Sequence, residues 1–508
     1  MSQTLDRSAA LYNPELAPES ATNTWKTLNL FNWWMAGWHS MAGYTMAIGL
    51  FAFGLNGWQA IIAFIAGAII LYWANNLTGV AGQREKVPFP VFARAAFGVF
   101  GANIPAILRA IVAVFWYGIQ TYLASAAVMI LVMKIAPGTA GLAEGTFLGL
   151  SGLGWICFLL LSALQWAVLL SGLETVRRLT DFAGPTIWVA VLALAVWMLY
   201  RAGWTIDLSA VTTAEVPSGA RQVLGIASAA FIVAAYMAGP SLNFADFTRN
   251  APSESSVRRG NALGLLINAS LFGIVSVVIA LSAAEVYGDA THDLVHLVAD
   301  IDNVTVLLVT IIAVSIATAG VNIICNFVAP VYDLINIRPG LFTFRRAGTL
   351  VAVLAVVVTP WNLFSSPVIV NQLIGGIGAF MGPLFGIITV DYYLLRRKHL
   401  DTESLFNDRP DGLYFYRGGY NPRAIAALAI GGAVALLLTF VPAWADAVPF
   451  AWPAGIVVGG LAYWLLHTGR TVRIVPDGQE HPAPNAVTGG PEDGGPPPPA
   501  RVAPATTR

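Results

Sequence analysis

Long apolar runs separated by short polar segments fill the chain from about residue 25 to residue 470. A helix that spans a membrane needs about 20 mostly apolar residues. The pattern therefore predicts an all-α polytopic membrane protein with twelve transmembrane helices. They are expected at residues 29–53, 57–79, 103–134, 152–172, 182–200, 222–244, 261–285, 303–331, 346–364, 368–394, 424–443 and 450–467.

The composition supports a membrane protein. Of the 508 residues, 57% are hydrophobic and 11% are charged, whereas soluble domains contain roughly 25% charged residues. The 27 basic and 27 acidic residues balance, which gives no reason to expect a nucleic acid partner. Cys157 and Cys325 lie in apolar runs, and as an isolated pair they predict neither a disulfide framework nor a metal site.

The distribution of Lys and Arg predicts the orientation in the membrane. With the N-terminus inside, the outer loops contain only Lys134, Arg201 and Arg221, and the other 24 of the 27 basic residues lie on the inner side. The loop 286–302 carries four Asp and no Lys or Arg, as an outer loop should. We therefore expect an inner (plasma) membrane protein with both termini in the cytoplasm.

The two ends of the chain differ from the apolar region. Residues 1–24 are polar and lack the features of a signal peptide, so we expect a cytoplasmic N-terminal segment followed by a retained first span. Residues 470–508 are rich in Pro and Gly, which predicts a disordered cytoplasmic tail, although its four consecutive prolines could bind a partner.

Two predicted helices share a short motif. An aromatic residue followed by Met-Ala-Gly occurs at Trp34 and again at Tyr236, five spans and 202 residues later. An odd number of spans inverts the topology, which predicts two inverted repeats, at 25–200 and 201–400, followed by helices 11 and 12 at 401–469. Interruptions of both helices are expected at the following residues: Gly37, Gly239 and Pro240. Alternatively, the glycines only allow close helix packing.

Polar side chains in helices 3 and 8 indicate a binding site. Trp116 and Gln120 are four residues apart and share a helix face. An indole offers a flat stacking surface and an amide offers both donors and an acceptor, so the pair suits a flat, uncharged heterocycle. Asn322 and Asn326 repeat the polar half of this arrangement, although such amides can also cross-link helices.

Ionisable residues are rare inside the predicted spans. His39 lies near mid-membrane and is either a functional group or a hydrogen-bonded core histidine. Arg109, Asp246, Asp333 and Asp391 lie towards cytoplasmic helix ends, where snorkelling or pairing between helices explains them. Asp246 could also belong to an inner gate. No catalytic constellation, metal-ligand cluster or nucleotide-binding loop is apparent, so we expect neither an enzyme nor a bound cofactor.

Several segments resemble the nucleobase:cation symporter family 1. They are residues 88–105 running into Arg109 and 116–120, the segment 243–249, and the pattern Asn322-x-x-x-Asn326-x-x-x-Pro330. The resemblance covers about residues 25–470, and the Trp-Met-x-Gly-x-His stretch of helix 1 looks most like the allantoin, uracil and purine permease branch. It implies a LeuT-like fold with alternating access, in which the 5+5 inverted repeats precede two C-terminal helices.

The resemblance also implies a function. Members import planar nucleobase-like heterocycles, such as uracil, allantoin, cytosine, purines or hydantoins, by cation symport. In the family's hydantoin transporter the ligand stacks on tryptophans of helices 3 and 6 and bonds to a helix 3 glutamine and a helix 8 asparagine. The matching positions here are Trp116, Gln120 and Asn326, with Tyr236 or, if shifted by one, Met237 for the helix 6 aromatic; we choose Tyr236. His39 or Ser40 falls near the substrate-facing position of helix 1.

One departure from the family concerns the coupling ion. The family's sodium site draws hydroxyl ligands from a Ser-Thr pair in helix 8, and the corresponding residues here are Gly320 and Val321. Neither offers a side-chain oxygen, so we expect proton coupling, or at least transport that does not depend on sodium. The alternatives are a passive channel or facilitator for small polar solutes, a symporter for a vitamin such as thiamine or pyridoxine, and a membrane-embedded enzyme.

Overall fold

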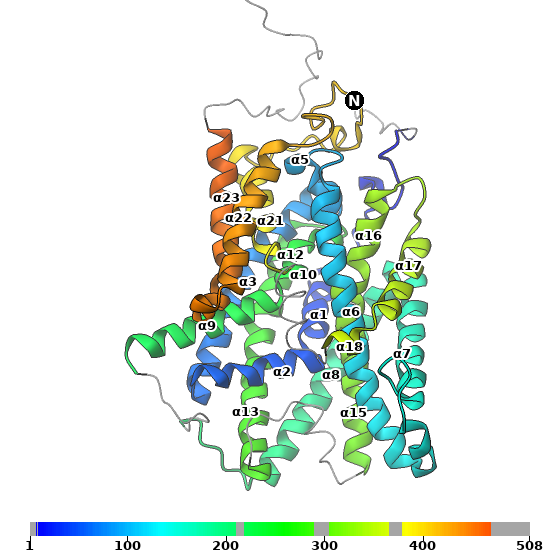
Figure 1. Cartoon of the computed structure of the whole chain (residues 1–508), viewed down its shortest axis with the longest axis vertical. Coiled ribbons are helices and arrows are strands. Elements are labelled where there is room, and N and C mark those ends of the chain that lie inside the picture. The colour runs from blue at the N-terminus through cyan, green and yellow to red at the C-terminus, as the bar shows by residue number, and fades with distance from the viewer. Residues whose placement is uncertain (1–6, 8, 210–217, 289–303, 365–377, 469–508) are drawn as a thin grey trace, which may run out of the picture.

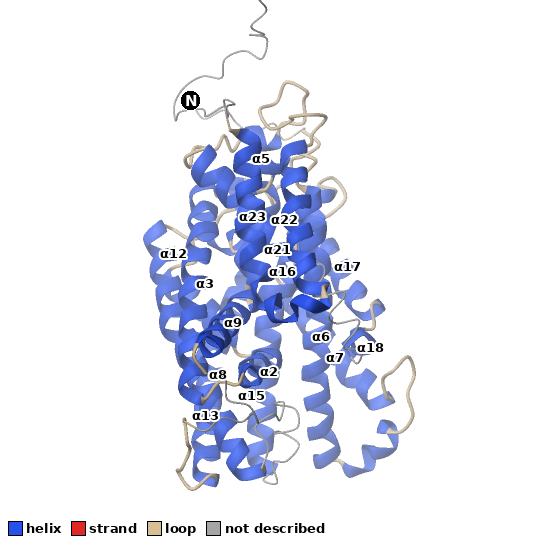
Figure 2. Ribbon diagram, turned by 60° about the vertical axis from the view of Figure 1, so that its left-hand side comes forward, coloured by secondary structure: helices blue, strands red, loops and turns tan. Residues whose placement is uncertain are grey.

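The computed structural model describes residue 7 and residues 9–209, 218–288, 304–364 and 378–468. These ranges form one bundle of helices without β-strands (Figure 2). Eight helical stretches within them are long and apolar enough to cross a membrane. They are α3 (Gly57–Glu85), α6 (Asn103–Ile135), α7 (Gly152–Leu170), α8 (Leu173–Arg201), Glu254–Tyr287 (α12, η4 and α13), Val304–Ile337 (α15, η5 and α16), α22 (Pro422–Phe440) and Pro442–His467 (η9 and α23).

The other four predicted spans are interrupted or only partly described. The first splits into α1 (Thr27–Trp38) and α2 (Met41–Gly49), and the sixth into α9 (Ala220–Tyr236) and α10 (Ala238–Leu242). The ninth contains α17 (Phe344–Val357) and α18 (Pro360–Phe364), and the tenth contains α21 (Met381–Thr389) and η7 (Val390–Leu395). Residues 368–377, most of the loop 286–302 and the tail 470–508 lie outside the described residues.

Several helix boundaries differ from the prediction for local reasons. The fifth helix begins at Leu173 rather than at 182, because Gly172, with φ of +91°, makes the turn after α7 by itself. Its first turns carry charges, which stay at the membrane boundary as ion pairs such as Arg177 with Asp181 at 2.9 Å. Hydropathy does not detect such a polar helical extension.

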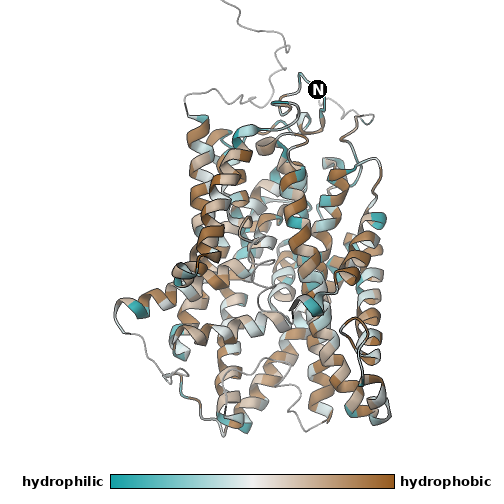
Figure 3. Ribbon diagram, in the orientation of Figure 1, coloured by the Kyte–Doolittle hydropathy of each residue, from teal (hydrophilic) through white to brown (hydrophobic). Residues whose placement is uncertain are grey.

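The outer surface of the bundle is apolar. Large side chains such as Ile69, Trp73 and Val189 are 44%, 64% and 72% exposed. Hydrophobic residues run along the outer helices, and hydrophilic residues gather in the loops at the ends of the bundle (Figure 3). This surface suits lipid rather than water, so the chain is a multi-pass membrane protein, as predicted.

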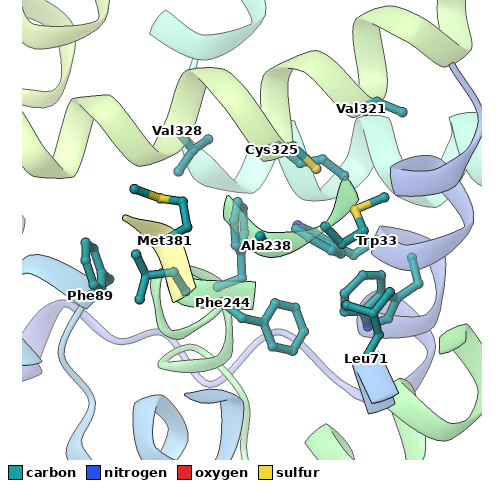
Figure 4. Close-up of a cluster of buried hydrophobic side chains, with 14 of the residues drawn as sticks. Trp33, Leu71, Phe89, Ala238, Phe244, Val321, Cys325, Val328 and Met381 are labelled. Carbon is teal, nitrogen blue, oxygen red and sulfur yellow. The ribbon is translucent and has the colours of Figure 1, made fainter. Parts of the chain in front are cut away.

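The interrupted helices lie inside the bundle. Figure 1 shows α1 and α10 at its centre. Helix α1 packs against α8, α12 and α15, while α10 packs against α3, α6 and α21. The close-up in Figure 4 shows Ala238 of α10 facing Cys325 and Val328 of the eighth span, with Met381 of α21 beside them. The irregular backbone is therefore covered by protein, as a membrane interior requires.

Candidate functional site

A cavity of 260 Å³ lies where α6, the interruption between α9 and α10, the π-helical turn η5 (Ile323–Phe327) and α21 meet. The cavity is lined by seven of the residues that were singled out from the sequence: Trp116, Gln120, Tyr236, Gly239, Pro240, Val321 and Asn326. Arg109 lines it as well, although the sequence analysis placed this residue at a membrane boundary. The structure therefore brings the predicted stacking and amide groups of helices 3, 6 and 8 together on one cavity.

Helix α6 supplies one complete wall. Arg109, Val112, Trp116 and Gln120 all line the cavity, and their spacing of three, four and four places them on one helix face. At 1.5 Å per residue, this wall runs about 16 Å along the helix. The cavity thus extends from the amide of Gln120 past the indole of Trp116 to the guanidinium of Arg109.

The aromatic rings beside the cavity meet at different angles. The ring centroids of Trp116 and Tyr236 lie 6.4 Å apart, with the ring planes at 81°. Tyr236 itself stacks on Trp38, at 6.2 Å and 29°. A flat ligand that stacks on Trp116 would therefore lie nearly perpendicular to the Tyr236 ring. The stacking role expected for Tyr236 stays a prediction.

The amides of the site differ in their partners. The Gln120 side-chain oxygen has no hydrogen-bond partner among the described residues, and the Asn326 amide nitrogen donates to Asn322 at 3.2 Å. A buried amide without its partners costs free energy, so Gln120 is a group that a ligand would satisfy. Gln120 and Asn326 together offer donors and acceptors to a planar amide edge.

Asn322 does not line the cavity. Its amide nitrogen lies 2.9 Å from each of three acceptors, the Tyr117 carbonyl, the Thr121 hydroxyl and the Gln165 side-chain oxygen. These groups belong to α6 and α7, so Asn322 cross-links helices, which was the alternative interpretation of its sequence position. Gln165 was not predicted from the sequence, although a glutamine inside an apolar run is a signal for such a buried polar contact.

The interruptions lie close to, but not at, the predicted glycines. Gly37 lies inside α1, and the first break is at His39 and Ser40, whose backbones are extended. The second break is at Met237, so Gly239 and Pro240 belong to the first turn of α10. Gly37 is accommodated within α1, and the first break falls where Ser40 caps α2, whereas no side chain caps α10 at Met237.

A hydrogen bond connects the two breaks. The Ser40 hydroxyl caps α2 by accepting from the Gly43 amide at 3.0 Å, and it lies 3.1 Å from the Tyr236 hydroxyl. His39 is fully buried, with Nδ1 2.8 Å from the Tyr44 hydroxyl and its ring against Trp188. Neither His39 nor Ser40 lines the cavity, so the geometry favours a core role for His39.

Arg109 connects the cavity to the end of α10 and to η5. Its Nε donates to Asn243 at 2.9 Å, and its Nη2 donates to the Cys325 carbonyl at 2.6 Å. That carbonyl belongs to η5, and π-helical turns alter the regular backbone pairing, often at functional sites. Asp246 does not line the cavity; it accepts from the Phe89 amide at 2.8 Å and from Asn243 at 3.0 Å. Asn243 thus bonds to both Arg109 and Asp246, and each of the two is held by contacts between helices, as expected from the sequence.

Gly320, one of the two positions that the resemblance matches to the family's hydroxyl ligands, has apolar nearest neighbours. A Cβ atom on Gly320 would lie 3.8 Å from the Cβ atoms of both Ala36 and Ala183. Methyl groups cannot coordinate a hard cation, which needs oxygen ligands. The side-chain atoms nearest to that position are therefore methyl carbons rather than oxygens.

The fold and the cavity define a polytopic membrane transport protein built around two interrupted helices. The chain belongs to the family of permeases for cytosine/purines, uracil, thiamine and allantoin, whose model matches residues 17–465. The family resemblance seen in the sequence is thereby confirmed, and the protein is a transporter rather than an enzyme.

Two relatives illustrate the similarity. An allantoin permease of Bacillus subtilis (strain 168) is 32% identical over 477 residues, covering 92% of this chain and 95% of the relative. A purine-uracil permease of Arabidopsis thaliana is 31% identical, covering 83% of this chain and 70% of the relative. The similarity therefore extends through the whole transmembrane region.

Solved structures confirm the predicted LeuT-like architecture. MHP1, a nucleobase-cation-symport-1 family transporter, in a closed conformation with bromovinylhydantoin bound, matches with a TM-score of 0.70 at 23% identity, over 89% of this chain and 96% of that one. A Na⁺-coupled sialic acid symporter matches with a TM-score of 0.59 at 12% identity, over 89% and 92%. At these identities the likeness concerns the fold.

Proposed function

We propose that this chain imports a planar nucleobase-like heterocycle by cation symport with alternating access. The observation that carries the proposal is the grouping of Trp116, Gln120 and Asn326 on one cavity beside an interrupted helix. The indole face stacks on the ring, and the two amides bond to its alternating N–H and C=O groups. Allantoin, uracil, cytosine, purines and hydantoins share this amide edge, and the similarity to an allantoin permease makes allantoin the first compound to test.

A proton is the favoured coupling ion. This part of the proposal rests on Gly320 and Val321, which replace the family's hydroxyl ligands, and on the methyl groups that surround Gly320. A hard cation such as sodium needs several oxygen ligands, and the loss of two weakens that site. Proton coupling does not need such a cage, because one titratable group suffices.

Competitive uptake tests the substrate class. Cells that lack their own nucleobase permeases would express the chain and take up radiolabelled allantoin in the presence of uracil, cytosine, hydantoin, hypoxanthine, thiamine or pyridoxine. We expect one or more compounds with a planar amide edge to compete, and a protonophore to abolish accumulation. Competition by the vitamins alone would favour a vitamin symporter. Uptake that stops at equal concentrations on the two sides would favour a facilitator.

Both termini are proposed to lie in the cytoplasm, in the cell's inner (plasma) membrane. The two native cysteines are buried, so single introduced cysteines can report the orientation. Glu144 and Arg338 are exposed at opposite predicted sides. We expect an impermeant maleimide to label Glu144→Cys in intact cells, and Arg338→Cys only after permeabilisation. The reverse pattern would contradict the orientation.

A further inference from the structure

Asp333 is a buried carboxyl group that the binding site does not use. It lies on α16 (Val328–Ile337), seven residues and about 10 Å of helix beyond Asn326. Its exposed fraction is 0%, and neither side-chain oxygen has a hydrogen-bond partner among the described residues. The residue is therefore neither snorkelling nor paired, contrary to the explanation that its place near a helix end suggested.

The charged groups that act on Asp333 are Arg109 of α6 and Asp246 of α11 (Ala245–Thr248). Arg249 acts on Asp246, and its guanidinium donates to the Glu15 and Ala17 carbonyls. The other titratable groups that interact electrostatically with this set are the Cys325 thiol, with Arg109, and the Tyr332 hydroxyl, with Arg249 and Asp246. Asp333 thus shares one neighbouring cation, Arg109, with a second carboxyl group.

The hydrogen bonds indicate different protonation states for the carboxyl groups of Asp246 and Asp333. Asp246 accepts from the Phe89 amide and from Asn243, so its negative charge has donors. Asp333 has none among the described residues, and an ionised carboxylate buried without partners is costly. Two carboxyl groups that share a cation titrate together. The geometry therefore fits a neutral, protonated Asp333 beside an ionised Asp246.

We propose that Asp333 is the proton-carrying group of the transport cycle and that Arg109 couples it to the substrate cavity. The proposal rests on the proton symport argued above. When the cytoplasmic side opens, the Asp333 O–H bond breaks and its proton passes to entering water. The carboxylate that remains attracts the Arg109 guanidinium, which gives up its bond to the Cys325 carbonyl. Because Arg109 lines the cavity, this movement changes the cytoplasmic end of the substrate site.

Asp333→Asn separates proton transfer from substrate binding, because the amide imitates the neutral acid. In proteoliposomes, radiolabelled allantoin should still exchange against unlabelled allantoin, which needs no net proton movement. Accumulation driven by an inward proton gradient should be lost. If one proton is transported with each substrate molecule, the wild type should raise the internal allantoin concentration about tenfold above the external one for each unit of the pH gradient. Accumulation by Asp333→Asn at the wild-type ratio would overturn the proposal.

Asp246→Asn is the matched control, since it also neutralises a buried carboxyl group of the same cluster. It weakens the contact of Asp246 with Phe89 and should slow uptake, but the accumulation ratio should persist because Asp333 is intact. Loss of the ratio in Asp246→Asn together with its retention in Asp333→Asn would assign the proton to Asp246 and overturn the proposal.

Asp333→Glu keeps a carboxyl group in an altered position, so the pH midpoint of uptake should shift from that of the wild type. A purely structural residue would change the amount of folded protein without moving that midpoint, and an unmoved midpoint would count against the proposal. If the variants fail to fold, infrared difference spectra of the wild type should show a protonated carboxyl band that is lost in alkali. Its absence would overturn the proposal. Failure of the wild type to use a proton gradient would instead reject the proposed symport, and this inference with it.

Discussion

Trp116 is the residue on which the binding of a flat ring depends most directly, because it lines the cavity and the Tyr236 ring lies nearly perpendicular to it. We expect Trp116→Ala to weaken allantoin binding by about 1–3 kcal/mol, the usual contribution of a ring stacked on an aromatic side chain. This corresponds to a roughly 5- to 150-fold rise in Kd, measurable by radioligand binding to purified protein. Trp73→Ala is the control, since Trp73 is 64% exposed on the outside of α3. Equal Kd values for the two variants would contradict the stacking role.

Asn322 and Asn326 should respond differently to the same substitution. Asn322→Ala removes contacts with Tyr117, Thr121 and Gln165, and should lower the free energy of unfolding by about 1–3 kcal/mol. Asn326→Ala should mainly weaken ligand binding, because Asn326 lines the cavity. Thermal unfolding and binding of both variants, measured in parallel, test this division. An Asn322→Ala protein with native stability and altered ligand selectivity would reverse it.

The sequence located the local part of the site but not the part that depends on packing. Trp116 and Gln120 share a face whenever the segment is helical, so their spacing alone was sufficient. The role of Arg109 depends on Asn243, which is 134 positions away, and the role of Asn322 depends on Gln165, which is 157 positions away. Such contacts follow from how the helices pack, and a single sequence does not contain that information.

Individual helices show the same division between local and distant causes. Interruptions in helices 1 and 6 were predictable, because both segments repeat one motif and Gly239-Pro240 disfavours a continuous helix. Their exact sites were not, because Gly37 fits within α1 and the break occurs where Ser40 caps α2. The Ser40–Tyr236 contact that connects the breaks joins residues 196 positions apart.

The two glycines of the repeated motif offer a matched test at the scale of the helix. A Cβ atom at Gly239 would lie 3.2 Å from Cζ of Arg109, which is held on two sides by hydrogen bonds. A Cβ atom at Gly37 would meet nothing closer than 3.7 Å. Gly239→Ala should therefore cost about 1–3 kcal/mol through overpacking and reduce uptake, whereas Gly37→Ala should transport normally. Both rates can be compared at equal amounts of membrane protein. Greater damage from Gly37→Ala would contradict this packing.

At the scale of the whole molecule, the apolar runs were sufficient to predict a polytopic helical fold, because a bilayer imposes a minimum length on each span. The apolar runs did not predict where each helix begins, ends or is interrupted. The first and sixth spans are split, and the fifth and seventh begin earlier through polar turns that start at Leu173 and Glu254. Hydropathy reports exposure to lipid, whereas helix ends depend on capping and on ion pairs at the boundary.

Uptake by purified protein in proteoliposomes tests the proposed proton symport most directly. Radiolabelled allantoin would be offered outside vesicles with an alkaline interior and no sodium, at a clamped membrane potential. A second set of vesicles would have an inward sodium gradient and equal pH on both sides. We predict accumulation above the external concentration in the first set and none in the second. Accumulation only with sodium, or mere equilibration in both sets, would contradict proton symport.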